Sequence, residues 1–337
     1  DELSVARVSD LPKQGMAGKV CLVTGANAGL GFATARQLAL QGAHVVLVGR
    51  REKALKRAME KIAVELEASG SNGSCEAMVA DLDNIQSVRD FTSAFLEKHS
   101  RLDVFVMNAG IADYNSSTKL QKNHAGIENN FAINFLGHFA MTKDLKGLIT
   151  QTGREHGEAR IVVVSSTAHY VAIPEIGVHL NLKDLNSNDK ANALQRYGQS
   201  KLANLLFAQA LSKRLLADNV FVNAAHPGLV RTDLYDPFVE NVRAWGGRNK
   251  LFEPLARLIE EVFFLAYDAL TFTAEEGART QIWLAASPEV KEQNISGKYF
   301  HPHAQEVKPS VLAKRKVKGQ LLEDALCDFA EELLENL

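Results

Sequence analysis

Short apolar runs alternate with longer amphipathic stretches along most of this chain. The run at 20–24 is rich in β-branched residues and ends at a glycine-rich turn, which predicts a buried strand. The same reasoning predicts strands at 45–48, 75–79, 104–106, 161–164 and 220–224. Helices are expected between them, at 32–40, 52–68, 85–98, 126–148 and 196–217. Apolar strands that alternate with helices are typical of a parallel sheet with helices on both faces, so the pattern predicts a doubly wound α/β fold.

Both ends of the chain depart from this rhythm. Residues 1–17 are polar and irregular, and we expect a mobile lead-in there. Residues 304–337 are expected to form a helical tail, because Leu322, Ala325, Phe329 and Leu333 recur at helical spacing. We expect this helix to pack on the body; a helix that binds a partner is the alternative. The basic run at 314–318 suggests a solvated helix face, with peripheral contact to an acidic membrane surface as the alternative.

The composition excludes several classes of protein. Of 337 residues, 46% are hydrophobic and 23% charged, which suits a folded globular chain. Lys and Arg number 38 against 40 for Asp and Glu, so a nucleic-acid partner, which usually shows as a basic excess, is not expected. The three cysteines form no C-x-x-C pair, and His301 and His303 lack further ligands at suitable spacing, so neither a disulfide framework nor a metal site is expected.

The compartment stays open. No run approaches the ~18 apolar residues that span a bilayer. The chain begins with Asp1 rather than Met, so a leader, anchor or tag could be missing. A cytoplasmic location and a membrane-associated or organellar one are both retained as expectations.

A glycine-rich turn follows the first strand, at 24–31, with the spacing T-G-x-x-x-G-x-G. Small residues let the backbone approach a pyrophosphate, while the N-terminus of the next helix offers N–H groups and partial positive charge. A strand before and a helix after the turn favour a dinucleotide site, with a tight connecting turn that binds nothing as the alternative. The residues expected to contact the cofactor here are Gly25, Asn27, Ala28, Gly29, Leu30 and Gly31.

The second strand ends in Gly49-Arg50-Arg51. NAD sites usually carry an Asp or Glu near this point, which binds the ribose 2′-hydroxyl. An acidic side chain would repel a 2′-phosphate, whereas a guanidinium group binds one through two hydrogen bonds. We therefore expect NADP(H), bound by Arg50. The alternative is that both arginines only occupy the first turn of an exposed helix.

Tyr197 and Lys201 are four residues apart in a predicted helix, which places both side chains on one face. An ammonium group near a phenol favours the phenolate, so Lys201 is expected to lower the pKa of Tyr197 and make it a usable acid or base. Ligands of a doubly wound sheet bind beyond the carboxyl ends of the strands, so residues that follow other strands should share this rim. Ser165 is expected to bond the backbone at its strand end rather than to act in catalysis.

Taken in order, the motifs T-G-x-x-x-G-x-G, N-A-G, S-S and Y-x-x-x-K resemble those of the short-chain dehydrogenase/reductase superfamily, over residues from about 18 to 301. The segments at 134–139, 200–204 and 226–228 are similar to those of its retinol dehydrogenase-like, NADP-preferring members. Near relatives mostly have the sequence N-H-L-G-H-F in the first of these segments, whereas this chain has Phe135 at its second position.

The resemblance implies a single Rossmann-fold oxidoreductase domain over 18–303 and a role for each motif residue. Tyr197 would be the general acid/base, Lys201 would also hold the nicotinamide ribose, Ser166 would polarise the carbonyl, and Asn134 would support a proton relay through water. Thr232 would touch the carboxamide, and Asp81 the adenine ring. The full set of further cofactor contacts that we expect is Asp81, Leu82, Asn108, Ala109, Gly110, Tyr197, Lys201, Pro227, Gly228 and Thr232.

By the same analogy, residues 233–273 would form a small C-terminal substrate lid. Their aromatic and aliphatic side chains favour an apolar carbonyl or alcohol, such as a retinoid, a steroid, or another aliphatic or aromatic aldehyde or ketone. The alternative is that these residues pack on the core. Carbonyl reduction is the expected direction, because cells usually keep NADPH reduced.

Two other functions stay open. One is the reduction of a carbon–carbon or carbon–nitrogen double bond, and the other is an NADP(H)-binding regulator or scaffold with little turnover. Oligomeric state is open as well, because apolar positions in the Tyr197 helix suit a homodimer face as much as the core. These positions are Leu202, Leu206, Phe207 and Ala210.

Overall fold

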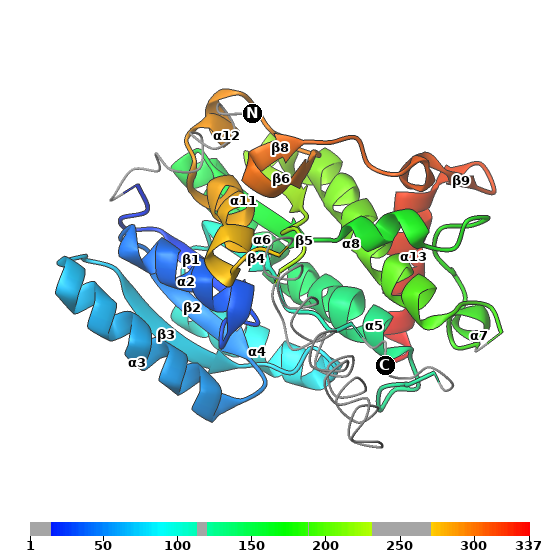
Figure 1. Ribbon diagram of the computed structural model, residues 1–337, viewed down its shortest axis with the longest axis horizontal. Helices are drawn as coiled ribbons and strands as arrows, with labels where there is room; N and C mark the ends of the chain where they lie inside the picture. Colours follow the sequence, from blue (N-terminus) through cyan, green and yellow to red (C-terminus); the bar gives the residue numbers. More distant parts are fainter. Residues whose placement is uncertain (1–14, 113–119, 188, 231–270) are drawn as a thin grey trace, which may run out of the picture.

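The computed structural model describes residues 15–112, 120–187, 189–230 and 271–337 (Figure 1). Within these residues the main sheet has eight strands in the order β3-β2-β1-β4-β5-β6-β7-β8. Neighbouring strands from β3 to β7 run parallel, and β8 runs antiparallel to β7. The strands are β1 (Val20–Thr24), β2 (His44–Gly49), β3 (Ser74–Val79), β4 (Val104–Met107), β5 (Ala159–Val164), β6 (Val220–Ala225), β7 (Tyr299–His301) and β8 (Gln305–Glu306). The predicted doubly wound α/β fold is confirmed; β7 and β8 are too short to show as apolar runs.

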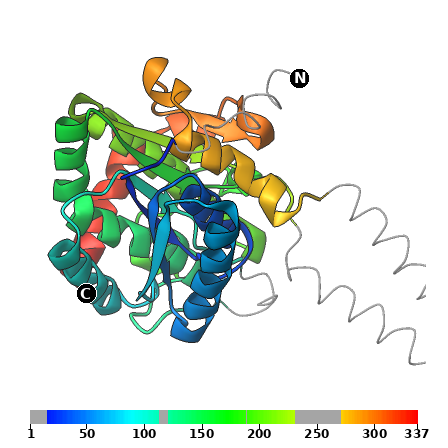
Figure 2. The ribbon, with the colours of Figure 1, turned by 90° about the vertical axis from the view of Figure 1, so that its left-hand side faces the viewer.

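Helices cover both faces of the sheet, because successive strand residues point to opposite sides. Val23 and Val106 belong to one buried cluster, which joins the sheet to α2, α3 and α11. Their neighbours Leu22 and Phe105 belong to a second cluster, which joins the sheet to α4, α6, α8 and α13. Helices α2 and α11 pack against each other although they are far apart in sequence (Figure 2). The helices are α2 (Gly29–Leu40), α3 (Glu52–Ser69), α4 (Ile85–Lys98), α6 (Gly137–His156), α8 (Ala193–Leu215), α11 (Ala274–Ala286) and α13 (Leu322–Glu335).

The predicted helix at 126–148 is wrong at its start. Gly126 has a left-handed backbone, and the Glu128 carboxylate accepts hydrogen bonds from the N–H groups of Asn130 and Phe131, which caps a helix that begins at 129. The short helix α5 (Asn129–Phe131) then leads into a wider π-helical turn, Ala132–Leu136, before α6 continues. Such a turn often marks a functional position in a helix.

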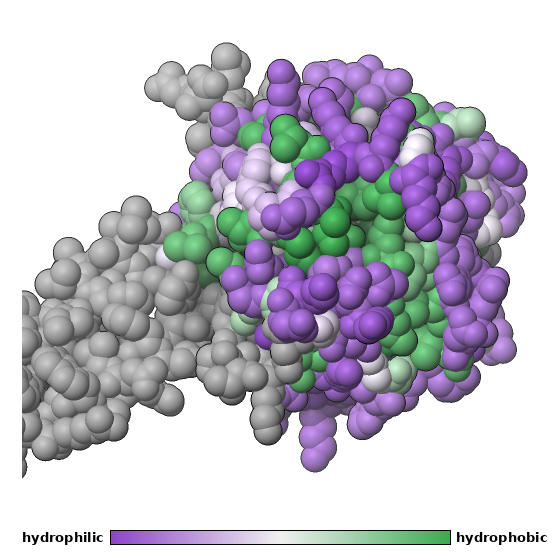
Figure 3. All heavy atoms as spheres, turned by 90° about the vertical axis from the view of Figure 1, so that its right-hand side faces the viewer, coloured by the Kyte–Doolittle hydropathy of each residue, from purple (hydrophilic) through white to green (hydrophobic). Residues whose placement is uncertain are grey.

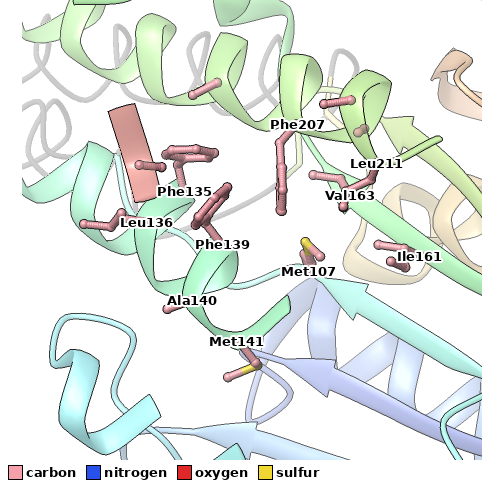
Figure 4. Packing of buried hydrophobic residues seen from close by; sticks show 14 of the residues in the cluster. Met107, Phe135, Leu136, Phe139, Ala140, Met141, Ile161, Val163, Phe207 and Leu211 are labelled. Atoms are coloured by element: carbon pink, nitrogen blue, oxygen red, sulfur yellow. The ribbon is translucent and has the colours of Figure 1, made fainter. Parts of the chain in front are cut away.

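A group of phenylalanines fixes this irregular turn against α8. The Phe135 ring contacts that of Phe207 edge to face, with centroids 5.8 Å apart, and Phe139 lies 5.1 Å from the same ring (Figure 4). Leu202, Leu206, Phe207 and Ala210 are all buried within the chain. The positions that suited either a dimer face or the core therefore lie in the core.

The C-terminal tail packs on the body, as predicted. Phe329 of α13 contacts the Phe131 ring at 6.1 Å, and α13 lies against α8. Hydrophilic residues border an apolar band on the side where α13 lies (Figure 3). The basic run at 314–318 is not a helix face: a 3₁₀ turn ends at Lys314, and the two-residue strands β9 (Lys316–Val317) and β10 (Gln320–Leu321) form a hairpin. The chain reverses there at Lys318 and Gly319, both of which have positive φ, and α13 begins only after this hairpin, at Leu322.

At the other end, the expected lead-in at 1–17 falls mostly outside the described residues. Met16 is fully buried in the core, and its N–H donates to the Gln41 carbonyl at 3.1 Å. Met16 therefore anchors the end of this segment to the core. All three cysteines are free thiols, as expected from their spacing.

Candidate active site

The site lies where the order of the strands reverses. Strand β1 has β2 on one side and β4 on the other, so the connections after β1 and β4 leave in opposite directions and open a crevice at their carboxyl ends. A cavity of about 350 Å³ occupies this position. Thr24 and Gly25 line it from the end of β1, and Asn108 from the end of β4.

The turn after β1 is closely packed against β4. Gly25 has φ +67°, and a Cβ at this position would lie 3.0 Å from Ala109 Cα. A Cβ at Gly31 would lie 2.3 Å from the Gly25 carbonyl oxygen and 2.6 Å from Asn108 Nδ2. The Asn108 amide in turn donates to the Thr24 carbonyl at 2.9 Å. Glycine at these two positions is therefore required by the backbone path that shapes the cavity.

The N-terminus of α2 faces this cavity without a side-chain cap. Its N-cap residue, Ala28, has no side chain that can accept a hydrogen bond, and the first turn of the helix contains no acidic residue. The first N–H groups of α2 and its positive dipole end are therefore available to an anionic ligand. Ala28, Gly29 and Leu30 all line the cavity.

Most of the predicted cofactor contacts gather around this one cavity. Twelve of them line it: Gly25, Asn27, Ala28, Gly29, Leu30, Gly31, Arg50, Asp81, Leu82, Asn108, Ala109 and Gly110. Pro227 and Gly228 follow β6 and are not among its lining residues, although Val230 is. Thr232 and nearly all of the predicted lid, residues 233–270, lie outside the described residues.

Two arginines sit where β2 ends at the cavity. Arg50 and Arg51 are exposed, and both line the cavity. Arg51 is also the N-cap residue of α3. The arginines therefore stand both at the start of an exposed helix and at the cavity, where the sequence had offered these as alternatives. No acidic side chain stands at the end of β2, while Asp81, after β3, lines the cavity further along.

Helix α8 carries the Tyr197–Lys201 pair. It begins with a capping box in which Asn192 and Gln195 bond each other's backbone N–H groups. Tyr197 and Lys201 then lie one turn apart, with Lys201 Nζ 5.7 Å from the centroid of the Tyr197 ring. The Lys201 side chain is buried, and its ammonium group donates to the Val164 carbonyl at the end of β5, at 3.4 Å.

The expected effect of Lys201 on Tyr197 is not what the structure shows. Burial raises the pKa of Tyr197 above its usual value, and the opposing influence is a hydrogen bond with Ser166 rather than the Lys201 charge. The reason is desolvation, which penalises the phenolate more than the neighbouring hydroxyl stabilises it. Burial also lowers the pKa of Lys201 to about 8. Tyr197 is therefore a phenol, and Lys201 predominantly an ammonium, at neutral pH.

The two serines after β5 have different surroundings. Ser165 is buried and donates its hydroxyl hydrogen to the Lys201 carbonyl at 2.7 Å, so its expected backbone role is confirmed. Ser166 accepts from the Ala168 N–H at 3.1 Å and bonds Tyr197. Alternation along the chain thus directs one hydroxyl into the core and the other toward the rim.

Asn134 lies in the π-helical turn and is completely buried. Its side chain accepts from the Ile111 N–H at 2.7 Å and donates to the Ile111 carbonyl at 2.9 Å, which holds the segment after β4. The amide also donates to Ser200 Oγ at 3.0 Å, next to Lys201 on α8. The four predicted catalytic residues thus come from three different elements around the same rim.

Gly110 gives a measure of how closely these elements meet. A Cβ at Gly110 would lie 3.1 Å from Asn134 Oδ1 and 3.2 Å from Lys201 Nζ. The cavity wall at Gly110, the Asn134 amide and the Lys201 ammonium are therefore neighbours. A side chain at Gly110 would have to displace the Asn134 amide or the Lys201 ammonium slightly.

Sequence reasoning missed several residues that shape the site. Ile111, Ile133 and Val230 line the cavity and carry no polar signal that would have marked them. Asn204, one turn after Lys201, donates to the Val164 carbonyl at 3.1 Å, where the Lys201 ammonium also bonds. The available signal was its position, three residues after Lys201 in the same predicted helix.

A second cluster of titratable residues lies far from this rim, at the start of β2 and β3. Glu76 Oε1 is 2.7 Å from His99 Nε2 and 3.2 Å from His44 Nε2, and the three ligand atoms fall within 4.8 Å of one another. The Glu76 carboxylate also pairs with the Lys98 ammonium. That ammonium supplies the positive charge at the carboxylate, so we interpret the cluster as an ion network that ties α4 to the sheet edge.

A doubly wound sheet with a glycine-lined cavity at its switch point and a Tyr–Lys pair on the adjoining helix defines a nucleotide-dependent oxidoreductase. The sequence profile described as short chain dehydrogenase matches residues 19–179. This chain belongs to the short-chain dehydrogenase/reductase family and is a retinol dehydrogenase-like member of it. It is accordingly a hydride-transfer oxidoreductase that acts on CH–OH groups with a nicotinamide cofactor.

Individual relatives place the chain more closely. It is 38% identical to retinol dehydrogenase 14 of Homo sapiens over 299 residues, which cover 85% of this chain and 78% of that one. It is 35% identical to polyprenol dehydrogenase of Danio rerio over 297 residues, or 88% and 81% of the two chains. A crystal structure of an uncharacterized protein from Mycobacterium paratuberculosis superimposes with a TM-score of 0.67 at 28% identity, over 97% of each chain.

Among the described residues, no helix is both long and apolar enough to cross a bilayer.

Proposed function

We propose that this protein is an NADP(H)-dependent carbonyl reductase or alcohol dehydrogenase for apolar substrates. The observation that carries the cofactor preference is the position of Arg50, exposed at the end of β2 and lining the cavity. A 2′-phosphate at this point gains hydrogen bonds from a guanidinium group, and no acidic side chain at the end of β2 opposes it. The bound nicotinamide supplies or accepts the hydride.

The residues around the rim provide the proton chemistry. Tyr197 gives a proton to the substrate oxygen during reduction and takes one during oxidation, and Ser166 donates a hydrogen bond to that oxygen. Burial keeps Tyr197 protonated, because it raises the pKa of the phenol. A protonated phenol is the form that reduction needs, which favours carbonyl reduction as the working direction at neutral pH.

Lys201 and Asn134 support this proton transfer. The Lys201 ammonium hydrogen-bonds the end of β5 and lies beside Gly110, where it can hold a ribose hydroxyl. Asn134 ties the wall after β4 to α8 through Ile111 and Ser200. During reduction, water near Asn134 and the Lys201 ammonium would return a proton to Tyr197, whose ring centroid lies 5.7 Å from Lys201 Nζ.

The substrate class rests on two considerations. Relatives that cover most of this chain are named for retinol and for polyprenol, both apolar alcohols. Residues 233–273, the predicted lid, are rich in aromatic and aliphatic side chains. An apolar aldehyde, ketone or alcohol fits both, because such a wall binds a ligand by burying its surface.

Tyr197→Phe tests the catalytic proposal. We expect turnover with retinal, a steroid ketone or a short aldehyde to fall by at least ~100-fold, while NADPH affinity, measured by fluorescence titration, stays within a few-fold. Unchanged turnover would remove Tyr197 from the mechanism.

Arg50→Asp tests the cofactor proposal. Arg57→Asp, at an exposed arginine of α3 that does not line the cavity, is the matched charge change. We expect Arg50→Asp to weaken NADPH binding by ~10- to 100-fold and NADH binding by much less, because only NADPH carries the 2′-phosphate. Equal losses for both cofactors, or equal losses in both variants, would refute a specific contact.

A further inference from the structure

His138 lies between the cofactor turn and the proton-relay turn and has no role in the function proposed so far. It is the second residue of α6 and is only 2% exposed. Its Nε2 is 2.8 Å from the Thr24 hydroxyl, at the end of β1, and its Nδ1 is 3.1 Å from the carbonyl oxygen of Asn134. One imidazole ring therefore bridges the glycine-rich turn and the π-helical turn.

The hydrogen-bond balance of Thr24 fixes the direction of these bonds. The Thr24 hydroxyl oxygen accepts from the backbone N–H groups of Asn108 and Ala109, both at 3.0 Å, which uses its two lone pairs. Its single hydrogen must then be donated. His138 Nε2 at 2.8 Å is the nearer acceptor, since the Val106 carbonyl is 3.4 Å away.

The tautomer of His138 follows from this balance. A ring nitrogen that accepts a hydrogen bond carries no proton, so the proton of neutral His138 resides on Nδ1 and is donated to the Asn134 carbonyl. If the ring were protonated, His138 Nε2 and the Thr24 hydroxyl would both be donors, and neither could accept from the other. Burial, together with the Lys201 charge, lowers the pKa of His138 to about 4, in keeping with a permanently neutral ring.

We propose that His138 is a positioning residue for the proton relay. It holds the Asn134 carbonyl at a fixed position relative to the ends of β1 and β4. This inference rests on the function proposed above. The donors run in one direction, from the N–H groups after β4 through Thr24 and His138 to Asn134, so each bond polarises the next. The cofactor-binding edge and the relay turn are thereby set by one chain of buried contacts.

Two substitutions separate the two bonds of the ring. His138→Asn keeps an amide donor near the place of Nδ1, and His138→Gln keeps an amide near the place of Nε2, whereas His138→Phe removes both. If the bond to Asn134 matters, His138→Asn retains turnover within a few-fold, while His138→Gln and His138→Phe lose ~10- to 100-fold in kcat. His156→Phe, at the exposed C-terminal end of the same helix, is the matched control and should behave as the wild type.

A merely structural role predicts a different pattern. In that case the variants would lose activity in proportion to their loss of thermal stability, and the pH profile of the remaining activity would be unchanged. The proposal requires kcat to fall more than the affinity for NADPH, and requires the pH profile of kcat to shift in His138→Gln but not in His138→Asn. Equal kcat in the Asn and Gln variants would overturn it.

Spectroscopy tests the same proposal independently of activity. In the full-length protein, ¹⁵N chemical shifts of the His138 ring should report a proton on Nδ1 alone from pH 9 down to about pH 5, because the ring's pKa is near 4. A proton on Nε2, or a charged ring at neutral pH, would refute the assignment even if no substrate had been found. Loss of activity in Tyr197→Phe with the expected His138 tautomer would support both proposals. An inactive wild type with the expected tautomer would overturn the proposed function and the relay role together, and would leave His138 only as a bridge between the two turns.

Discussion

The hydroxyl of Ser165 donates to the backbone carbonyl of Lys201 at 2.7 Å. This bond joins the end of β5 to the middle of α8, and so sets the distance between the strand that presents Ser166 and the helix that presents Lys201. The two adjacent serines therefore have different roles, because Ser165 is directed into the protein and Ser166 toward the rim.

Substituting each serine in turn should separate these roles. Ser165→Ala is expected to cost about 1–2 kcal/mol of unfolding free energy, because a buried hydrogen bond is lost, and to change kcat/KM only a few-fold. Ser166→Ala is expected to lower kcat/KM by ~100-fold, because the donor to the substrate oxygen is removed, and to cost less stability than Ser165→Ala, because its bond to the Ala168 N–H is only partly buried. Urea unfolding and steady-state kinetics measure both quantities, and the reverse ranking would show that the two serines have been assigned the wrong way round.

Lys201 should give the reaction an alkaline limit. Burial lowers its pKa to about 8, so the ammonium is present below that pH and is lost above it. We expect kcat/KM for carbonyl reduction, which reports the free enzyme, to decline as pH rises through about 8. In Lys201→Arg, whose guanidinium does not titrate in this range, the decline should move to higher pH although the maximal rate is lower. If kcat/KM of Lys201→Arg declined at the same pH as that of the wild type, the decline would report the titration of another group.

Gly31 should tolerate no side chain. A Cβ there would lie 2.3 Å from the Gly25 carbonyl oxygen, so Gly31→Ala must displace the turn that lines the cavity. We expect a loss of about 1–3 kcal/mol in stability and a drop in NADPH affinity of at least tenfold. Gly147→Ala in α6 is the control, because a Cβ there meets nothing within 4 Å and should add about 0.5–1 kcal/mol of stability. Normal NADPH binding by Gly31→Ala would mean that the turn does not position the cofactor.

Glu158 should contribute stability that depends on pH. Burial alone would raise the pKa of its carboxyl group, but the Arg160 charge and hydrogen bonds from Lys19 and Arg160 outweigh burial and lower it to about 2. The folded pKa lies below the unfolded value, so this stabilisation is present above about pH 4.5 and is lost as the pH falls toward 2.

Glu158→Gln is the corresponding experiment. Near pH 7 it should destabilise the protein by about 2 kcal/mol, and this difference from the wild type should shrink as the pH falls from about 4.5 toward 2. Glu52→Gln, at an exposed pair with Lys56, should leave stability essentially unchanged at either pH, because solvent screens the pair. Urea unfolding at several pH values would decide, and a Glu158→Gln difference that is constant with pH would contradict the assignment.

Much of the fold was predictable from local pattern. The strand Val20–Thr24 and the helix Ile85–Lys98 have the predicted bounds, because each is a simple periodic run with a turn or a capping residue at its end. The helix predicted from residue 126 was less accurate, because its start depends on the Glu128 cap and its course on a π-helical turn. Neither leaves a periodic signal in the sequence.

The sequence by itself determined most of the residues that line the cavity, since the carboxyl ends of parallel strands must meet on one rim. Only the tertiary structure decided how those residues influence one another. Tyr197 has a raised rather than a lowered pKa, because desolvation depends on everything packed around the ring and not on a lysine four residues away. The bridge from Thr24 through His138 to Asn134 likewise joins residues more than 100 positions apart in the chain. Hydrogen-bond balance and burial are properties of the packed molecule, and residue spacing does not contain them.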